Sequence, residues 1–417
     1  MMNISVVIWA DDGELIERLE RQRGILTVAR TSTDMVEVIA LSETGLADAV
    51  ILAGVPDLIE TRDIDAITER GVPVVVLCDD PAQSNRLNRA GAHVAVGAID
   101  AVELGVLIQR ACGERQRGTR SDGAKASAEP AGNPSGRRGR VVVFWGPSGS
   151  PGRSLVALNY AVECALDARE VILLDADTYG ATQAVQLGLL DEAAGLAQIC
   201  RTVDQDRFDA HTLERICAPV VIAGAKMRVA TGLPRANRWP ELRPTALRRA
   251  VLALQERCDV IVIDVAGPLE LDEELSFDTA APQRNGVAAA MLRIADEIYA
   301  VGQANSIGVP RLIRALDEMQ ASVGELAVKV VFNKVSAASV GSAPHRALAE
   351  TWARFGPAQP VVAYLPHDPD AVESALLAGS ALAEIAPHSA LRIGIAGLAG
   401  RKIKGRQRIL PRRAASR

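Results

Sequence analysis

Aromatic side chains make up only 3% of the 417 residues. Proteins that hold single-stranded nucleic acid stack its bases on Phe, Tyr and Trp, so this shortage argues against an RNA reader. The six cysteines form no Cys-x-x-Cys pair and have no histidine at ligand spacing, which argues against a zinc site and a disulfide framework. We expect reduced cysteines in a cytoplasmic protein.

Long apolar runs are also missing. No stretch reaches the roughly 18 apolar residues that a membrane-spanning helix needs. The apolar run at 4–10 is too short, and too soon followed by acids, for a signal peptide. With 48% apolar and 23% charged residues, the chain has ordinary globular composition and a length that indicates two or three domains.

The net charge is −5, but basic residues are concentrated in two segments of the chain. Residues 114–140 hold seven Arg or Lys against three acids, and residues 401–417 hold eight against none. The first stretch is rich in Gly, Ser, Pro and Ala and too poor in large apolar residues to order itself. We predict a flexible basic linker at 114–139 and a basic tail at 401–417.

The first 113 residues alternate short β-branched runs with segments that carry apolar residues at helical spacing. Such alternation is typical of a parallel sheet covered by helices on both faces. The predicted strands are 4–10, 47–54 and 72–78, and the predicted helices are 14–22, 63–71 and 101–112. This is an α/β domain at 1–113.

The same alternation resumes at residue 140 and continues to about 400. Most of the predicted strands are nearly continuous apolar runs, as expected for strands buried on both faces. The predicted strands are 141–146, 170–177, 219–225, 259–267, 297–303, 327–335 and 360–366. We therefore predict a doubly wound sheet over 140–400.

A loop of small residues, Gly146 to Ser154 with the sequence GPSGSPGRS, follows the first of these strands and precedes an amphipathic helix. Small residues let backbone N–H groups and a helix N-terminus surround a phosphate. Arg153 would add positive charge and Ser154 a hydroxyl for Mg²⁺. The loop departs from the standard phosphate-binding pattern at Pro147 and at Arg153, and a plain strand-to-helix turn is the alternative.

Polar residues end three later strands. Asp175 and Asp177 end the strand at 170–177, Asp264 ends an apolar strand of Walker B form, and Asn333 follows VKVVF. Ligands collect at the carboxyl edge of such sheets, where carboxylates serve Mg²⁺ or attacking water. Each acid alone has the alternative of a cap or turn residue.

These segments, in this order, resemble the MinD/ParA superfamily of P-loop ATPases across about 260 residues. The resemblance implies an α/β, doubly wound P-loop NTPase that binds ATP and Mg²⁺. It assigns catalysis to Asp175, Asp177 and Asp264, Mg²⁺ binding to Ser154 and Asp264, and nucleotide binding to Gly149, Ser150, Gly152, Arg153, Ser154, Asn333 and Pro366. The turn at 366–369 would border the base.

Two departures from the family pattern affect activity. The signature Lys near the start of the loop falls at Ser148, and the Walker Lys is Arg153. A planar guanidinium is not interchangeable with an ammonium at a tight phosphate site, and Pro151 removes one N–H from the loop. We expect slow hydrolysis, or nucleotide binding without turnover.

The segment 1–113 resembles a degenerate response-regulator receiver, a flavodoxin-like domain. Asp11 and Asp12 match the receiver's metal-binding acids, but the phosphoacceptor position is Ala53 and the later Thr is Cys78. The Lys expected near Gly97 is also missing. Without a carboxylate at 53 there is no nucleophile, so a docking or dimerisation module is expected.

Together the two halves resemble the TadZ/CpaE family, which localises Flp (Tad) pilus or type IV secretion machinery at the cell pole. They also resemble an actinobacterial septum-site-determining group with the same architecture. The resemblance implies a homodimer with pilus, secretion or division proteins as partners, in the cytoplasm at a pole or on the membrane periphery. A nucleotide-independent scaffold is a further alternative. We expect a solvated basic tail, because its glycines weaken a membrane helix, and peripheral contact with anionic lipid is the alternative. Nucleic acid is not expected as a partner because no helix-turn-helix is present.

Overall fold

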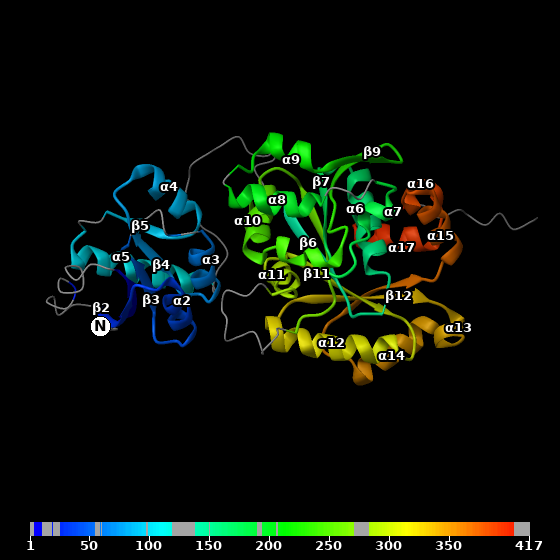
Figure 1. Ribbon diagram of the computed structural model, residues 1–417. Coiled ribbons are helices and arrows are strands. Elements are labelled where there is room, and N and C mark those ends of the chain that lie inside the picture. Colours follow the sequence, from blue (N-terminus) through cyan, green and yellow to red (C-terminus); the bar gives the residue numbers. More distant parts are fainter. Residues whose placement is uncertain are drawn as a thin grey trace, which may run out of the picture. The chain divides into compact units, whose positions relative to one another are not determined.

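The computed structural model describes residues 4–10, 19, 26–54, 59, 61–96, 99–118, 138–149, 151–189, 194–205, 207–270 and 283–403 (Figure 1). These residues divide into two compact units, one before and one after the gap at 119–137. Each unit has its own sheet and its own buried apolar clusters.

The first unit is built on a five-stranded parallel sheet. The strands are β1 (Ile4–Trp9), β2 (Leu26–Ser32), β3 (Ala49–Leu52), β4 (Val74–Leu77) and β5 (His93–Ala95). Their order, β2-β1-β3-β4-β5, is the flavodoxin-like order of doubly wound sheets. The predicted α/β class of the N-terminal half is therefore confirmed.

Two strands of this unit were missed by sequence reasoning, for physical reasons. β2 lies at the sheet edge and most of its residues are partly or fully exposed, so it carries no apolar run. β5 has only three residues. The predicted helix at 14–22 lies outside the described residues except for Leu19, as do Asp11, Asp12 and Gly97.

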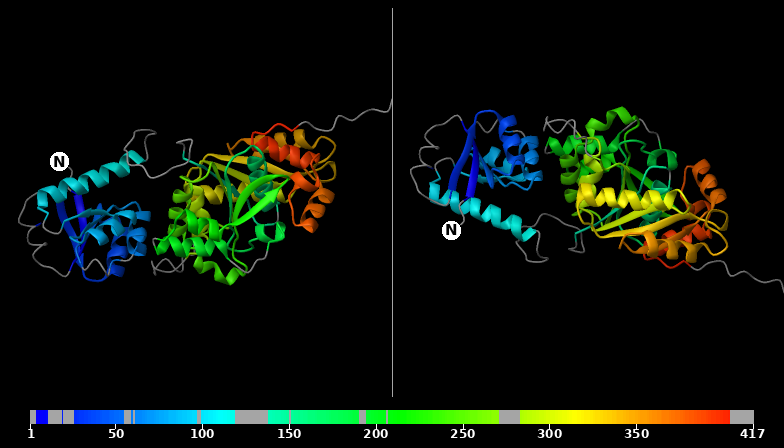
Figure 2. Two further views of the ribbon diagram at one scale, coloured as in Figure 1. Left: turned by 90° about the horizontal axis from the view of Figure 1, so that it is seen from above. Right: turned by 90° about the horizontal axis from the view of Figure 1, so that it is seen from below.

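The helices of the first unit are α2 (Met35–Glu43), α3 (Thr61–Glu69), α4 (Pro81–Arg89) and α5 (Ala101–Gly118). Figure 2 shows α5 as the long cyan helix beside the strands of this unit. It continues to Gly118, so the first residues of the predicted linker 114–139 are helical. The residues of α5 after 113 are polar, so no apolar pattern in the sequence predicts that the helix continues. A helix can extend beyond the core that it covers.

The second unit is built on an eight-stranded sheet with the order β13-β12-β11-β6-β10-β7-β9-β8. The strands are β6 (Arg140–Trp145), β7 (Val171–Ala176), β8 (Ala218–Ile222), β9 (Ala225–Ala230), β10 (Val260–Val265), β11 (Glu297–Gln303), β12 (Val328–Val335) and β13 (Val361–Pro366). All pairs are parallel except β8 with β9.

The antiparallel edge differs from the predicted strand at 219–225. Residues 218–222 and 225–230 form two strands joined by a tight turn at Ala223 and Gly224, both with positive φ. The sequence hid β9 because Lys226 and Arg228 interrupt its apolar residues. β8 alternates between exposed and half-buried residues, as an antiparallel edge strand does.

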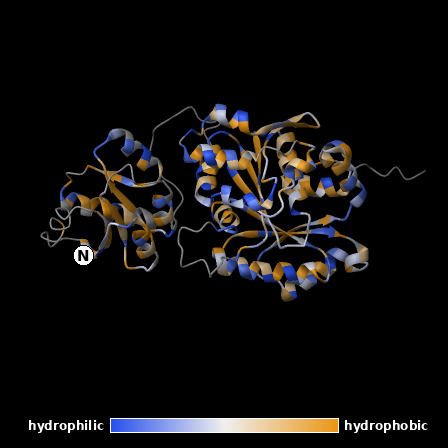
Figure 3. Cartoon of the chain, in the orientation of Figure 1, coloured by the Kyte–Doolittle hydropathy of each residue, from blue (hydrophilic) through white to orange (hydrophobic). Residues whose placement is uncertain are grey.

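Side chains alternate between the two faces of this sheet, and each face has its own core. Along β6, Val141, Val143 and Trp145 belong to one buried cluster and Val142 and Phe144 to the other, as a period of two requires. Figure 3 shows the strands in orange between helices of mixed colour. The helices are α6 (Arg153–Leu166), α7 (Gln183–Gln186), α8 (Gly195–Asp204), α9 (Ala210–Ile216), η2 (Ala236–Glu241), α10 (Pro244–Leu254), α11 (Gly286–Arg293), α12 (Gly308–Val323), α13 (Ala337–Val340), α14 (Pro344–Phe355), α15 (Pro369–Ala378), α16 (Leu382–Ile385) and α17 (Ala390–Leu398).

Among the described residues, none of the helices combines the length and apolarity required to cross a bilayer.

Candidate functional site

The loop between β6 and α6 depends on glycine at two described positions. Gly152 has φ 85°, and a Cβ there would lie 2.4 Å from Nδ2 of Asn333. Gly149 has φ 110°, and a Cβ there would collide with the guanidinium of Arg311. The positive φ favours glycine at both positions, and at Gly152 the buried amide of Asn333 also leaves no room for a Cβ. Ser150, a predicted phosphate contact, lies outside the described residues.

Arg153 is the first residue of α6, and its side chain points into the protein. Its Nε donates to Oδ1 of Asp264 at 2.6 Å and its Nη2 to Oδ2 of Asp177 at 2.5 Å. Only 11% of the Arg153 side chain is exposed. Burial lowers the pKa of this guanidinium, but the charges of Asp264 and Asp177 outweigh burial and raise the pKa above its ordinary value.

Strand register brings the acids together. β7 and β10 are neighbours, and Asp175 lies directly opposite Asp264 in their pairing. Asp177 follows β7, so all three acids stand at the carboxyl edge of the sheet. The predicted grouping of Asp175, Asp177 and Asp264 with Arg153 is what the structure has.

Asp175 and Asp264 are fully buried. Oδ2 of Asp175 accepts backbone hydrogen bonds from Thr182 at 2.9 Å and Gln183 at 2.8 Å. Burial raises the pKa of Asp175, and the neighbouring charge of Asp264 raises it further. Asp175 therefore acts as a fixed support for the loop that starts α7.

Gln183 is a site residue that the sequence did not reveal. Its Nε2 donates to Oδ2 of Asp264 at 2.9 Å and to the carbonyl oxygen of Ser154 at 3.1 Å. It thus joins the Walker-type strand to the start of α6. A single glutamine after an acidic segment forms no motif, so only the folded chain identifies it.

A cavity of about 770 Å³ opens beside the loop, within the range of small-molecule sites. Its walls include Gly149, Gly152, Arg153 and Ser154 on one side, and Asn333 and Pro366 from the ends of β12 and β13 on the other. Asp177 also lines it, whereas Asp175 and Asp264 lie behind the wall.

Asn333 couples the two sides of this cavity. Its Nδ2 donates to the carbonyl oxygen of Pro151 at 2.8 Å, and the residue is 2% exposed. The amide therefore holds the loop in place. Its Oδ1 has no hydrogen-bond partner in the described part of the chain, which leaves an acceptor for a ligand.

The acids do not fit a directly bound magnesium ion in this arrangement. Both oxygens of Asp264 accept from protein donors, Arg153 and Gln183. Within the described ranges, no group of three or more His, Cys, Asp or Glu side chains has metal-binding geometry. The predicted Mg²⁺ contact through Ser154 and Asp264 stays a prediction that these contacts do not favour.

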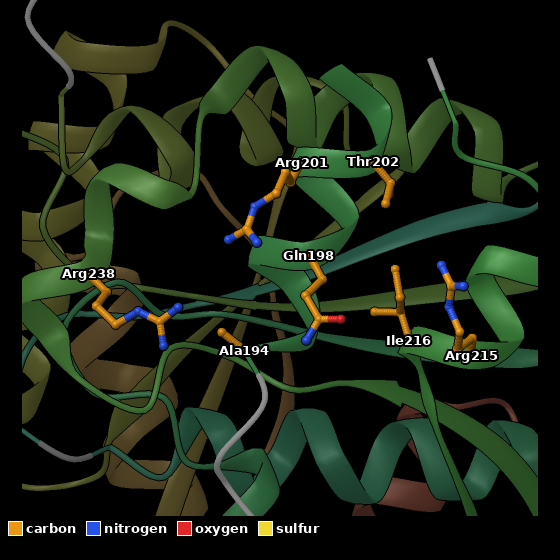
Figure 4. Close-up of a pocket in the computed structure, with 7 residues that line it drawn as sticks. All are labelled: Ala194, Gln198, Arg201, Thr202, Arg215, Ile216 and Arg238. Atoms are coloured by element: carbon orange, nitrogen blue, oxygen red, sulfur yellow. The ribbon is translucent and has the colours of Figure 1, made fainter. Parts of the chain in front are cut away.

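A smaller cavity of about 270 Å³ lies away from the predicted residues. Figure 4 shows three arginines around it, Arg201 on α8, Arg215 on α9 and Arg238 on η2. Arg201 and Arg238 both pair with Glu241. The single carboxylate of Glu241 offsets only one of these positive charges.

Comparison with known proteins places the fold of the second unit. No family model matches the chain, and no curated protein matches it. Among solved structures, a ParA family ATPase from Chlorobium tepidum is similar at 17% identity and a TM-score of 0.50, over 62% of this chain and 98% of that one. The cell division ATPase MinD from Pyrococcus furiosus is similar at 18% identity and a TM-score of 0.48, over 63% and 97%.

The similarity to the ParA family ATPase shows the fold of the second unit. The chain is an α/β protein in which a unit with flavodoxin-like strand order is followed by a P-loop domain of the MinD/ParA type. The fold class predicted from the sequence is confirmed.

Proposed function

We propose that the second unit binds ATP in the 770 Å³ cavity and that its nucleotide state governs the positioning of Flp (Tad) pilus or type IV secretion machinery, as in the TadZ/CpaE family. One observation carries this proposal. The glycine loop, Arg153, Asn333 and Pro366 line a single cavity at the carboxyl edge of the sheet, where doubly wound folds bind their ligands.

The roles follow from position. Amides of Gly149 and Gly152, with the N-terminus of α6, surround phosphate oxygens, and the Ser154 hydroxyl lines the same wall. Oδ1 of Asn333 accepts from the base, which Pro366 borders. Turnover is slow, because Arg153 occupies the acids that would otherwise act on water.

The first unit supplies docking or dimerisation rather than phosphotransfer. Ala53 directly follows β3 at the carboxyl edge of that sheet, where a receiver carries its phosphoacceptor. An alanine has no nucleophile. Partners are a second copy of the chain and proteins of the secretion or pilus complex, with the basic tail on anionic lipid. The described residues of that tail end at 403.

A nucleotide-independent scaffold is the second candidate function. It is favoured by the contacts of Arg153, Asp177, Asp264 and Gln183, which satisfy one another without a ligand. A septum-site role would use the same cavity as the pilus role. Affinity purification of the tagged protein separates the two roles: recovery with division proteins supports the septum-site role, and recovery with secretion components supports the pilus role.

ATP binding and turnover by the purified chain test the proposal, beside Arg153→Ala and Asp264→Ala. Arg346→Ala, which removes an exposed ion pair, is the matched control. We expect binding by the parent and the control, weaker binding by both site variants, and slow turnover. If none of the four proteins binds nucleotide, the proposal is wrong and the nucleotide-independent scaffold is the remaining candidate function.

A further inference from the structure

Each oxygen of Asp177, which lines the cavity, and of Asp264, which lies behind it, accepts at least one hydrogen bond from this chain. Oδ1 of Asp177 accepts from the backbone of Tyr179 at 2.8 Å and Gly180 at 3.0 Å, and its Oδ2 accepts from Arg153. Oδ1 of Asp264 accepts from Arg153 and its Oδ2 from Gln183. All four oxygens therefore have partners before any ligand arrives.

Mg²⁺ demands near-octahedral oxygen ligands and dehydrates reluctantly. At either carboxylate it would have to compete with charge-assisted hydrogen bonds, which are stronger than neutral ones. It would also have to sit beside a guanidinium whose two contacts fix it between the acids. Repulsion between the two cations is strong where both are shielded from water.

Arg153 keeps one donor nitrogen for a ligand. Nε and Nη2 bind the acids, whereas Nη1 has no partner among the described residues, and the side chain lines the cavity. A guanidinium presents donors in a rigid planar fork. It can therefore face carboxylates on one side and phosphate oxygens on the other, as a metal ion does between the same groups.

We propose that this cavity binds a nucleoside triphosphate without a divalent cation, with the guanidinium of Arg153 as the resident positive charge between the acids and the phosphates. The proposal rests on the nucleotide-binding function above. It assigns Arg153 a role that a lysine at this position would perform less well, because a guanidinium holds its donors in a rigid plane that can face both acids and the phosphates, whereas an ammonium is a compact point charge.

The test is the dissociation constant of a fluorescent ATP analogue for the full chain, measured in excess Mg²⁺ and in EDTA. We expect the constant in EDTA to equal that in Mg²⁺ within about threefold, or to be tighter. Binding at least about tenfold weaker in EDTA would overturn the proposal while leaving nucleotide binding intact. Absence of binding in both buffers would overturn the proposed function, and this inference with it.

Arg153→Lys sharpens the result. The lysine frees carboxylate oxygens and removes the bridge, so binding in EDTA should weaken by about tenfold or more and recover when Mg²⁺ is added. Arg314→Lys, which alters an exposed arginine on α12, should behave as the parent. A lysine variant that stays indifferent to Mg²⁺ would show that Arg153 is not the resident cation.

Discussion

Removing the guanidinium of Arg153 should destabilise the second unit far more than removing an exposed arginine. In Arg153→Ala the side chains of Asp264 and Asp177, 0% and 11% exposed, lose the ionic partner that they share. Two carboxylates then remain close together in a poorly solvated site. A buried charge without compensation is among the most costly defects in a protein.

The expected loss is about 3–5 kcal/mol of unfolding free energy, the usual result when one partner of a buried ion pair is removed. Gln183 still donates to Asp264, which holds the loss below that of two wholly unpaired charges. The matched control is Arg346→Ala, which breaks an i,i+4 pair with side chains 81% and 64% exposed. Its expected loss is about 0.5 kcal/mol or less.

Urea unfolding followed by tryptophan fluorescence measures both losses. Trp145, Trp239 and Trp352 belong to the second unit and Trp9 to the first, so the second unit dominates the signal. The two units can unfold in separate transitions. Because Arg153 and the ATP site both belong to the second unit, Arg153→Ala and ATP should shift the same transition. Losses of equal size in Arg153→Ala and Arg346→Ala would refute the network of buried contacts.

Three further predictions concern neighbouring residues. Because the folded state raises the pKa of Asp175 above its ordinary value of 3.8, it holds a proton that the unfolded chain has released. The free energy of unfolding should therefore fall as pH rises from that value to the raised pKa, and Asp175→Asn should flatten this slope in urea titrations at several pH values. Gly152→Ala should abolish ATP binding, since its Cβ would meet Asn333, whereas Gly400→Ala, with φ 79° and open space, should keep it. Asn333→Ala releases Pro151 and should weaken ATP binding by about tenfold in the same titration; unchanged affinity would remove Asn333 from the site.

The sequence predicts which residues gather at the site better than it predicts which of their atoms form hydrogen bonds with one another. Small residues after a buried strand, followed by acids at later strand ends, are local signals, and parallel strands bring their carboxyl ends to one edge. This is why the sequence brings Asp175, Asp177 and Asp264 to one sheet edge beside Arg153, where the structure has them. Which partner each oxygen takes depends on side-chain direction and on Gln183, and no spacing rule encodes either.

The same limit applies to the fold. Strands buried on both faces, such as β6 and β10, show as apolar runs. The edge strand β2 does not, because most of its residues are partly or fully exposed, and it was missed for this reason. β9 lies inside the sheet between β7 and β8, and it was missed because Lys226 and Arg228 interrupt its apolar residues. The charged residues in β9 are compatible with a sheet because Arg228 lies near Glu170 and Glu214, a contact between segments distant in sequence.

The most direct measurement of the central claim is photolabelling of the full chain with 8-azido-ATP, followed by peptide mapping. We expect labelled peptides from the base side of the cavity, between Asn333 and Leu376, and loss of label when unmodified ATP competes. Label on the smaller cavity around Arg201 and Arg215, or label that ATP does not displace, would contradict this claim.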